Sequence, residues 1–415
     1  MPQRPRRRPH DPPACDRLLV VLSDIEMGAG GPTDDFPHSD FLGEVIRSYG
    51  ERPFHRLPID LVFNGDTFDL LKTSYQGAFP RHITAEVALG KFRRIAAAHP
   101  AFFDAVRQFL GESRSGAARR VAFLVGNHDP EIQFPEVKQA IRELCDVDGR
   151  ISFPGDSLDI GKVHIEHGHQ LDPSFRMDAA VPFVRFDGQE VLNISWASAA
   201  LLDTIMPMQP LLCFHDRLKP KSEVFALLPD VKELLIGAFW QYWTHDYWKG
   251  YFDSNDPTRR LSWTVLKETI WRFGSRNPEI SMDDTFLKRL ENDDRYALYV
   301  LGHQHQATCW SYGDRKILRS GGFRNEYMLC NRGQELRPIP KSYVEAYLLG
   351  GVPVRSGLME LPAPPAPPGY VPESIFDVLP AVRSLLANNA RLAEDRAGQR
   401  AQEQRESRGR AKDKG

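Results

Sequence analysis

The chain of 415 residues is long enough for two or three domains, or for one α/β unit that carries insertions. A hydrophobic share of 41% supports a large core, which excludes a chain that is disordered throughout. The net charge of −2 argues against a dedicated nucleic-acid surface, and five scattered cysteines without paired spacing suit a reducing cytosol. We therefore expect a cytoplasmic protein without a nucleic-acid partner.

The N-terminal residues 1–16 are rich in arginine and proline and contain no apolar stretch. Such a segment predicts a disordered basic arm and not a secretory signal. No apolar run approaches the ~20 residues that a membrane-spanning helix needs. We expect at most a peripheral contact with the inner membrane face.

Apolar runs that end in polar clusters predict buried strands near residues 17–23, 59–64, 121–125, 163–166 and 296–301. Helical periodicity predicts helices near residues 39–49, 84–98, 101–110 and 136–144. Strands that alternate with helices indicate an α/β fold, whose core we assign to residues 17–174 and 295–350. The last segment, 361–415, is expected to contain a proline-rich spacer, a helix near residues 375–390 and a disordered charged tail.

Residues 175–294 interrupt this core and are rich in aromatic side chains. Helical spacing near residues 223–236 and 259–273 predicts an inserted helical subdomain with a small core of its own. An alternative is a lid whose apolar face receives an acyl chain or a membrane surface.

The predicted strands share one property, which is a cluster of metal-ligating or acid–base side chains at the end of each. The clusters comprise Asp24 and Glu26, Asp66 and Asp69, Asn127 with His128 and Asp129, His167 and His169, and His303 and His305. Because the carboxyl ends of parallel strands meet at one edge of a sheet, these groups can form a single site. Carboxylate, amide and imidazole donors suit Mn, Fe or Zn, and two such ions can clamp a phosphate ester.

The order Asp-x-Glu, Gly-Asp-x-x-Asp, Gly-Asn-His-Asp, His-Gly-His, Gly-His-x-His resembles the calcineurin-like metallophosphoesterases. Within that family it is most similar to the bacterial branch that includes UDP-diacylglucosamine pyrophosphohydrolase. The resemblance implies a four-layer α/β/β/α sandwich and a centre of two divalent ions. It implies ligands Asp24, Glu26, Asp66 and His305 for one ion, and Asp66, Asn127, His167 and His303 for the other. It also places His128 at the scissile phosphate as acid or charge stabiliser, oriented by Asp69 or Asp129.

One position departs from that family, which usually has histidine where this chain has Glu26. A carboxylate there favours harder ions, so we expect Mn first, with Mg, Fe and Zn as alternatives. The other interpretation is that Glu26 is a loop carboxylate and that its ion site is incomplete or empty. His169 is a candidate substrate contact, and so are Arg81 and His82, although a solvated surface pair explains the last two equally well.

We therefore predict hydrolysis of a phosphate monoester, diester or pyrophosphate by a metal-bridging hydroxide. The substrate is expected to be a phosphorylated small molecule or a nucleotide–lipid conjugate. A metal-dependent nuclease would use the same chemistry, but the chain lacks a basic stripe. The remaining alternative is a binding scaffold of the same fold without catalysis.

Overall fold

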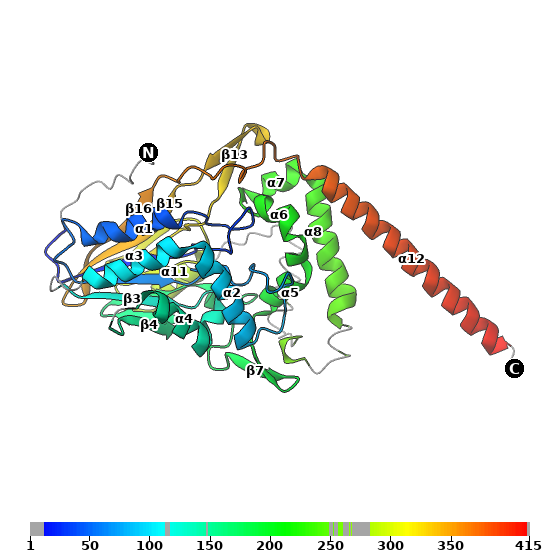
Figure 1. The fold of residues 1–415 in the computed structure, drawn as a ribbon, viewed down its shortest axis with the longest axis horizontal. Coiled ribbons are helices and arrows are strands. Elements are labelled where there is room, and N and C mark those ends of the chain that lie inside the picture. The colour runs from blue at the N-terminus through cyan, green and yellow to red at the C-terminus, as the bar shows by residue number, and fades with distance from the viewer. Residues whose placement is uncertain are drawn as a thin grey trace.

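Two β-sheets stacked face to face form the centre of the molecule, and helices cover their outer surfaces (Figure 1). The computed structural model describes residues 12–112, 117–146, 148–248, 252, 256–259, 265, 267 and 283–412. Most of the buried apolar side chains lie in two layers, one between the sheets and one between the first sheet and its helices.

The first sheet is built mainly from parallel strands. Its spatial order is β16 (Val352–Leu361), β15 (Lys341–Leu349), β1 (Arg17–Leu22), β2 (Ile59–Asn64), β3 (Arg119–Leu124) and β4 (Ile151–Gly155). Strands β1 to β4 run parallel, whereas β15 and β16 are antiparallel neighbours at one edge. In β1, Leu18 and Val20 face the helices while Leu19 and Val21 face the second sheet, as the alternation of a strand requires. Since β16 continues this sheet to Leu361, the core extends beyond the boundary at residue 350 expected from the sequence.

Four helices cover the outer face of the first sheet. They are α1 (Ser39–Arg47), α2 (Ala85–Ala98), α3 (Pro100–Gly111) and α4 (Pro135–Cys145). Aromatic rings fill the interface, where Phe63 of β2 packs against Phe102 of α3 and stacks on Phe123 of β3. The predictions of these four helices and of the first three strands are confirmed. These segments could be predicted because their apolar runs are long and their helical periodicity is clear.

The second sheet supplies the other face of the central layer. Its order is β11 (Thr308–Tyr312), β12 (Arg315–Arg319), β10 (Leu298–Leu301), β6 (Val163–Glu166) and β5 (Ser157–Ile160). Strands β6, β10 and β12 are parallel to one another. Helix α11 (Asp283–Asn292) packs on β11 and β12 and is the fourth layer of the described chain. The fold is therefore an α/β sandwich of four layers, α/β/β/α, as expected.

The described part of segment 175–294 contains strands as well as helices and shares cores with the rest of the chain. It contains β7 (Phe183–Phe186), β8 (Gln189–Leu192), α5 (Trp196–Thr204), α6 (Gln209–Asp216), β9 (Leu218–Lys219), α7 (Lys221–Leu227) and α8 (Pro229–Gln241) before α11. Helix α5 buries Ala199 and Leu202 in the main core. Apolar residues of α6 to α8 share a core with strand β13 (Tyr327–Cys330), which pairs with β9 and with β14 (Glu335–Pro338). The helix expected near residues 259–273 lies almost entirely outside the described residues.

The C-terminal helix is longer than the sequence analysis predicts. Ile375, Val378 and Val382 pack into the core shared by α6 to α8, which anchors the start of α12 (Leu379–Lys412). From there α12 extends away from the body (Figure 1). The structure thus shows a helix where a disordered tail was expected. Alanine, glutamate, glutamine, arginine and lysine, which make up most of this segment, all favour helix in an exposed chain.

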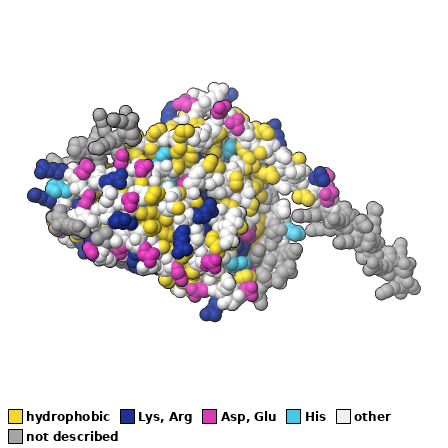
Figure 2. Space-filling model, viewed as in Figure 1, with side chains coloured by type: hydrophobic (Ala, Val, Ile, Leu, Met, Phe, Trp, Pro, Cys, Tyr) yellow, Lys and Arg dark blue, Asp and Glu magenta, His cyan; other side chains and the backbone are white. Residues whose placement is uncertain are grey.

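The surface carries mixed charge on the face seen in Figure 2, where Lys and Arg are interspersed with Asp and Glu. Trp240 and Phe252 of segment 175–294 expose 51% and 76% of their surface, an unusual degree for such large apolar side chains. No single described helix has the length and apolar composition needed to cross a bilayer. The helix α5 and the segment Met206–Asp216, bent by 40° at their junction, meet both criteria together.

Candidate metal centre

The site lies where the parallel strands of both sheets end. Strands β1, β2 and β3 of the first sheet and β6 and β10 of the second each lead into one of the polar clusters identified in the sequence. Glu26 N and Ile25 N donate to the Asp66 carbonyl at 2.8 and 2.9 Å, which ties the loop after β1 to the loop after β2. His303 N donates to both carboxylate oxygens of Asp24 at 3.1 Å, which ties the second sheet to the first.

The backbone is strained at this point. Four site residues are left-handed, with φ of 53° at Asp24, 53° at Glu26, 50° at Asp66 and 68° at His303. Such φ values are costly for residues with a side chain and are retained at functional sites. Glycine is needed beside them, because a Cβ at Gly126 would lie 2.1 Å from Asp66 Oδ1 and 2.3 Å from Asp66 N.

Four donor atoms from four strand ends form a compact set. Asp66 Oδ2 lies 3.1 Å from His167 Nε2. Asn127 Oδ1 lies 3.2 Å from the same His167 nitrogen and 2.8 Å from His303 Nδ1. Ligands bound at right angles to one ion with bonds of ~2.1 Å would be about 3.0 Å apart. These three spacings and the donor types are compatible with a divalent ion, and we call these four side chains the first ion position.

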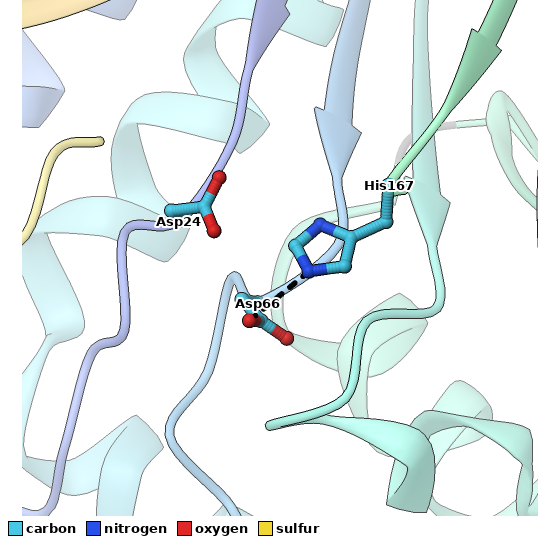
Figure 3. A group of neighbouring side chains, drawn as sticks. All are labelled: Asp24, Asp66 and His167. Atoms are coloured by element: carbon cyan, nitrogen blue, oxygen red, sulfur yellow. Dashed lines mark ion pairs between the residues drawn. The ribbon is translucent and has the colours of Figure 1, made fainter. Parts of the chain in front are cut away.

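Asp24 adds a carboxylate at the edge of this position. One ligand atom of each of Asp24, Asp66 and His167 lies within 4.8 Å of the other two. Figure 3 shows the two carboxylates and the ring, which come from the ends of β1, β2 and β6, directed toward a common space. Burial raises the pKa of Asp24, because a fully enclosed carboxylate beside Asp66 has too little positive charge around it. A bound cation would supply that charge.

His128 is arranged as an acid and not as a ligand of the first position. Its Nδ1 lies 3.0 Å from Asp69 Oδ1, and its backbone N–H donates to Asp66 Oδ1 at 2.7 Å. Burial alone would lower the pKa of His128, but the charges of Glu26, Asp66 and Asp69 raise it to about 9. These carboxylates favour the protonated imidazole, and 15% of the His128 side chain is exposed.

Asp129 has a different role from the one predicted. Its Oδ1 accepts from Gly126 N and its Oδ2 from Thr67 N, both at 2.7 Å, and no described contact joins its side chain to the His128 ring. Asp129 therefore fixes the backbone of two site loops, and the orientation of His128 falls to Asp69. From the sequence alone, Asp129, which follows His128 directly, and Asp69, which lies in another loop, were equally good candidates for orienting the His128 ring.

His169 is buried beside the first ion position. Its ring centroid lies 5.4 Å from that of His167, and neither of its ring nitrogens has a hydrogen-bond partner. Burial and the nearby rings of His167 and His303 hold its pKa well below the ordinary value, so the imidazole is neutral. Buried polar atoms without partners are rare in proteins. A substrate oxygen or a further ligand interaction would satisfy His169, which keeps its predicted role as a substrate contact open.

Arg81 and His82 lie apart from the described contacts of the centre and face segment 175–294. Buried Arg81 pairs with Asp203 of α5 and donates to the Tyr242 hydroxyl at 2.8 Å. His82 Nε2 lies 2.9 Å from Asp256 Oδ2, and its ring stacks on Phe186 at 4.1 Å between centroids. Their contacts attach segment 175–294 to the core, and substrate binding by these two residues stays a prediction.

Replacing Arg81 with alanine distinguishes a structural role in attaching segment 175–294 from a role in substrate binding. Loss of one partner of a largely buried ion pair should lower the free energy of unfolding by about 3 kcal/mol, measured by chemical denaturation. Arg383→Ala is the control, since its exposed pair with Asp230 should contribute less than ~1 kcal/mol. An Arg81→Ala protein of unchanged stability but with a raised KM would instead identify Arg81 as a substrate contact.

Three charged residues near Glu26 and His305 were not expected from the sequence. Lys72, Arg324 and Glu326 are all buried or nearly so, and each contacts a predicted site residue. Arg324 and Glu326 follow β12, which is parallel to β10, so their position at the same sheet edge was a usable signal. Lys72 stands three residues after Asp69 in the same loop, and its direction could not be read from the sequence.

Comparisons with known proteins add little to this geometry. No family model matches the sequence, and no curated protein matches it. Among solved structures, an archaeal phosphodiesterase is 7% identical over 82% of this chain and 99% of its own, with a TM-score of 0.28. Vps29 from Entamoeba histolytica complexed with Zn²⁺ is 9% identical over 83% and 98%, with a TM-score of 0.23. Phosphopantetheinyl hydrolase from Mycobacterium tuberculosis is 11% identical over 78% and 96%, with a TM-score of 0.24. Similarities this low carry no argument, and function must be inferred from this chain's own residues.

Proposed function

We propose that this protein is a hydrolase of phosphate esters that depends on a bound divalent metal ion. The observation that carries the proposal is the first ion position, in which donor atoms of Asp66, Asn127, His167 and His303 are spaced as ligands of one ion. The order of the polar motifs, which resembles that of calcineurin-like metallophosphoesterases, supports the same conclusion.

A divalent ion bound there would polarise a phosphoryl oxygen and make a nearby water molecule more acidic. The protein's own contribution is His128, which Asp69 holds in place. From that position His128 would donate a proton or a hydrogen bond to an oxygen of the ester as negative charge develops on it. The strained loops keep these groups in position before the substrate arrives.

The donor set limits which ions would bind. Carboxylate, amide and imidazole ligands without cysteine suit Mn, Fe or Zn, and we propose Mn. The resemblance implies a second ion at Asp24, Glu26, Asp66 and His305, which we call the second ion position.

For the substrate we propose a phosphorylated small molecule, with a nucleotide–lipid conjugate as one candidate. A polar hollow beside Asp69 is lined by residues that include Lys72, Thr73, Arg94 and Gln209. Such a lining would accept a polar part of the substrate and would not accept an acyl chain. An acyl chain would have to lie elsewhere, for example against the exposed aromatic side chains of segment 175–294.

The proposal is tested by hydrolysis of bis-p-nitrophenyl phosphate and p-nitrophenyl phosphate. Protein stripped of metal with a chelator should be inactive toward both, and added Mn should restore turnover of at least one. Metal-loaded protein that hydrolyses neither compound would contradict the proposal and favour a binding scaffold.

A further inference from the structure

The side chain of Glu26 is fully occupied by protein cations. Its Oε2 accepts hydrogen bonds from Lys72 Nζ at 2.8 Å and from Arg324 Nη1 at 3.0 Å. Its Oε1 lies 3.2 Å from the same Arg324 nitrogen and 3.3 Å from His305 Nε2. Glu26 has no exposed surface. Two permanently charged partners therefore stabilise this fully buried carboxylate without a metal ion.

Lys72 is held at this place by other acids. Its Nζ also contacts Asp35 Oδ2 at 2.6 Å and Asp69 Oδ2 at 3.3 Å. The contacts with Glu26 and Asp35 are hydrogen bonds, and Asp69 adds a further ion pair. The ammonium group of Lys72 is therefore held among three buried acids.

Arg324 is fixed in a similar way. Its Nη2 donates to Asp216 Oδ2 at 2.8 Å and lies 3.3 Å from Asp35 Oδ2. Asp35 is in turn bound by Arg217, whose Nε donates to its Oδ1 at 2.8 Å. The two cations beside Glu26 thus belong to a rigid, mostly buried network.

The first ion position has no such cations. In the described part of the chain, no lysine or arginine makes an ion pair or hydrogen bond with Asp66, Asn127, His167 or His303. The first ion position and the surroundings of Glu26 therefore differ in the groups that balance the negative charge of their carboxylates. A divalent ion would complete the charge at the first position, whereas an ion coordinated by Glu26 would be repelled by Lys72 and Arg324.

We propose that Lys72 and Arg324 take the place of the second metal ion, so that the centre holds a single divalent ion. Glu26 is then a partner of these cations and not a metal ligand. His305 is likewise a partner of protein side chains and not a metal ligand. Its Nδ1 lies 2.9 Å from Glu326 Oε1, and its Nε2 faces Glu26. This inference rests on the proposed function, because it presupposes that the first position binds metal.

The test is the metal content of the full-length protein. Protein stripped with a chelator, reloaded with excess Mn and desalted should retain one Mn per chain, measured by mass spectrometry of the metal. Its electron paramagnetic resonance spectrum should be that of an isolated Mn ion, without the exchange coupling of a pair. Glu26→Gln should retain the same single ion with a Kd within about three-fold of wild type.

The outcomes separate this inference from the proposed function. Two retained ions in wild type, with a coupled spectrum, would overturn the inference and leave the hydrolase proposal intact. No retained ion would overturn both. Lys72→Met adds a second readout: if Lys72 replaces an ion, this variant should bind additional Mn at Glu26, which the double variant Lys72→Met/Glu26→Gln should lose. Because the wild-type count does not depend on any variant, misfolding of a variant leaves the inference testable.

Discussion

Asp66→Ala should lose the bound ion and with it about a thousand-fold or more of kcat/KM for phosphoester hydrolysis. Asp66 contributes Oδ2 to the first ion position and holds the loop of His128 through Oδ1, so one substitution removes a ligand and displaces the acid. A bound ion is worth several kcal/mol in such reactions, which corresponds to at least this factor. Metal analysis and steady-state kinetics on the same preparation measure both effects.

Asp60→Asn is the matched control for Asp66→Ala. Asp60 lies on the same strand, β2, and pairs with Arg17 at 3.2 Å, away from the strand end that carries the site. The Asp60→Asn protein should retain the bound ion and wild-type kinetics. An Asp66→Ala protein with wild-type metal content and activity would show that the ligand assignment is wrong.

His128→Gln should leave the metal content unchanged and lower kcat by about 10²- to 10⁴-fold, the usual contribution of a general acid. The reason is that His128 contacts Asp69 and the loop of Asp66 without contributing a donor to the first ion position. Glutamine keeps the size of the side chain and can donate a hydrogen bond, but it cannot carry the charge. Kinetics with metal analysis on the same sample checks this separation.

Asp69→Asn tests how His128 is held. Removing the Asp69 charge removes one of the effects that raise the pKa of His128, so its proton is lost at lower pH. If the protonated ring is the active form, the alkaline fall of kcat/KM should move to lower pH in Asp69→Asn. An alkaline limb at the wild-type position in this variant, or loss of the ion from His128→Gln, would remove His128 from the role of acid.

The framework of the site could be predicted because two simple patterns agree. Continuous apolar runs mark buried strands, and parallel strands bring their carboxyl ends to one edge. Asp66, Asn127, His167 and His303 each follow such a run and are brought together as expected. Both patterns can be recognised without knowing the structure of segment 175–294 or of the two terminal segments.

The parts that could not be predicted depend on contacts between distant residues. Nothing in the local sequence of Glu26 indicates that Arg324, 298 positions away, will bind its carboxylate. The shared core of segment 175–294 was missed for the same reason, because Leu218 and Leu234 pack against Leu329 and Ile375 from the other end of the chain. A helical period shows that a face is apolar and does not show which element covers it.

The most direct test is anomalous diffraction at the manganese edge from crystals of the Mn-loaded protein. A peak within ~2.4 Å of Asp66 Oδ2, Asn127 Oδ1, His167 Nε2 and His303 Nδ1 is the predicted result. A map with no peak among these four atoms, from protein that has been supplied with excess Mn, would contradict the assignment of the metal centre.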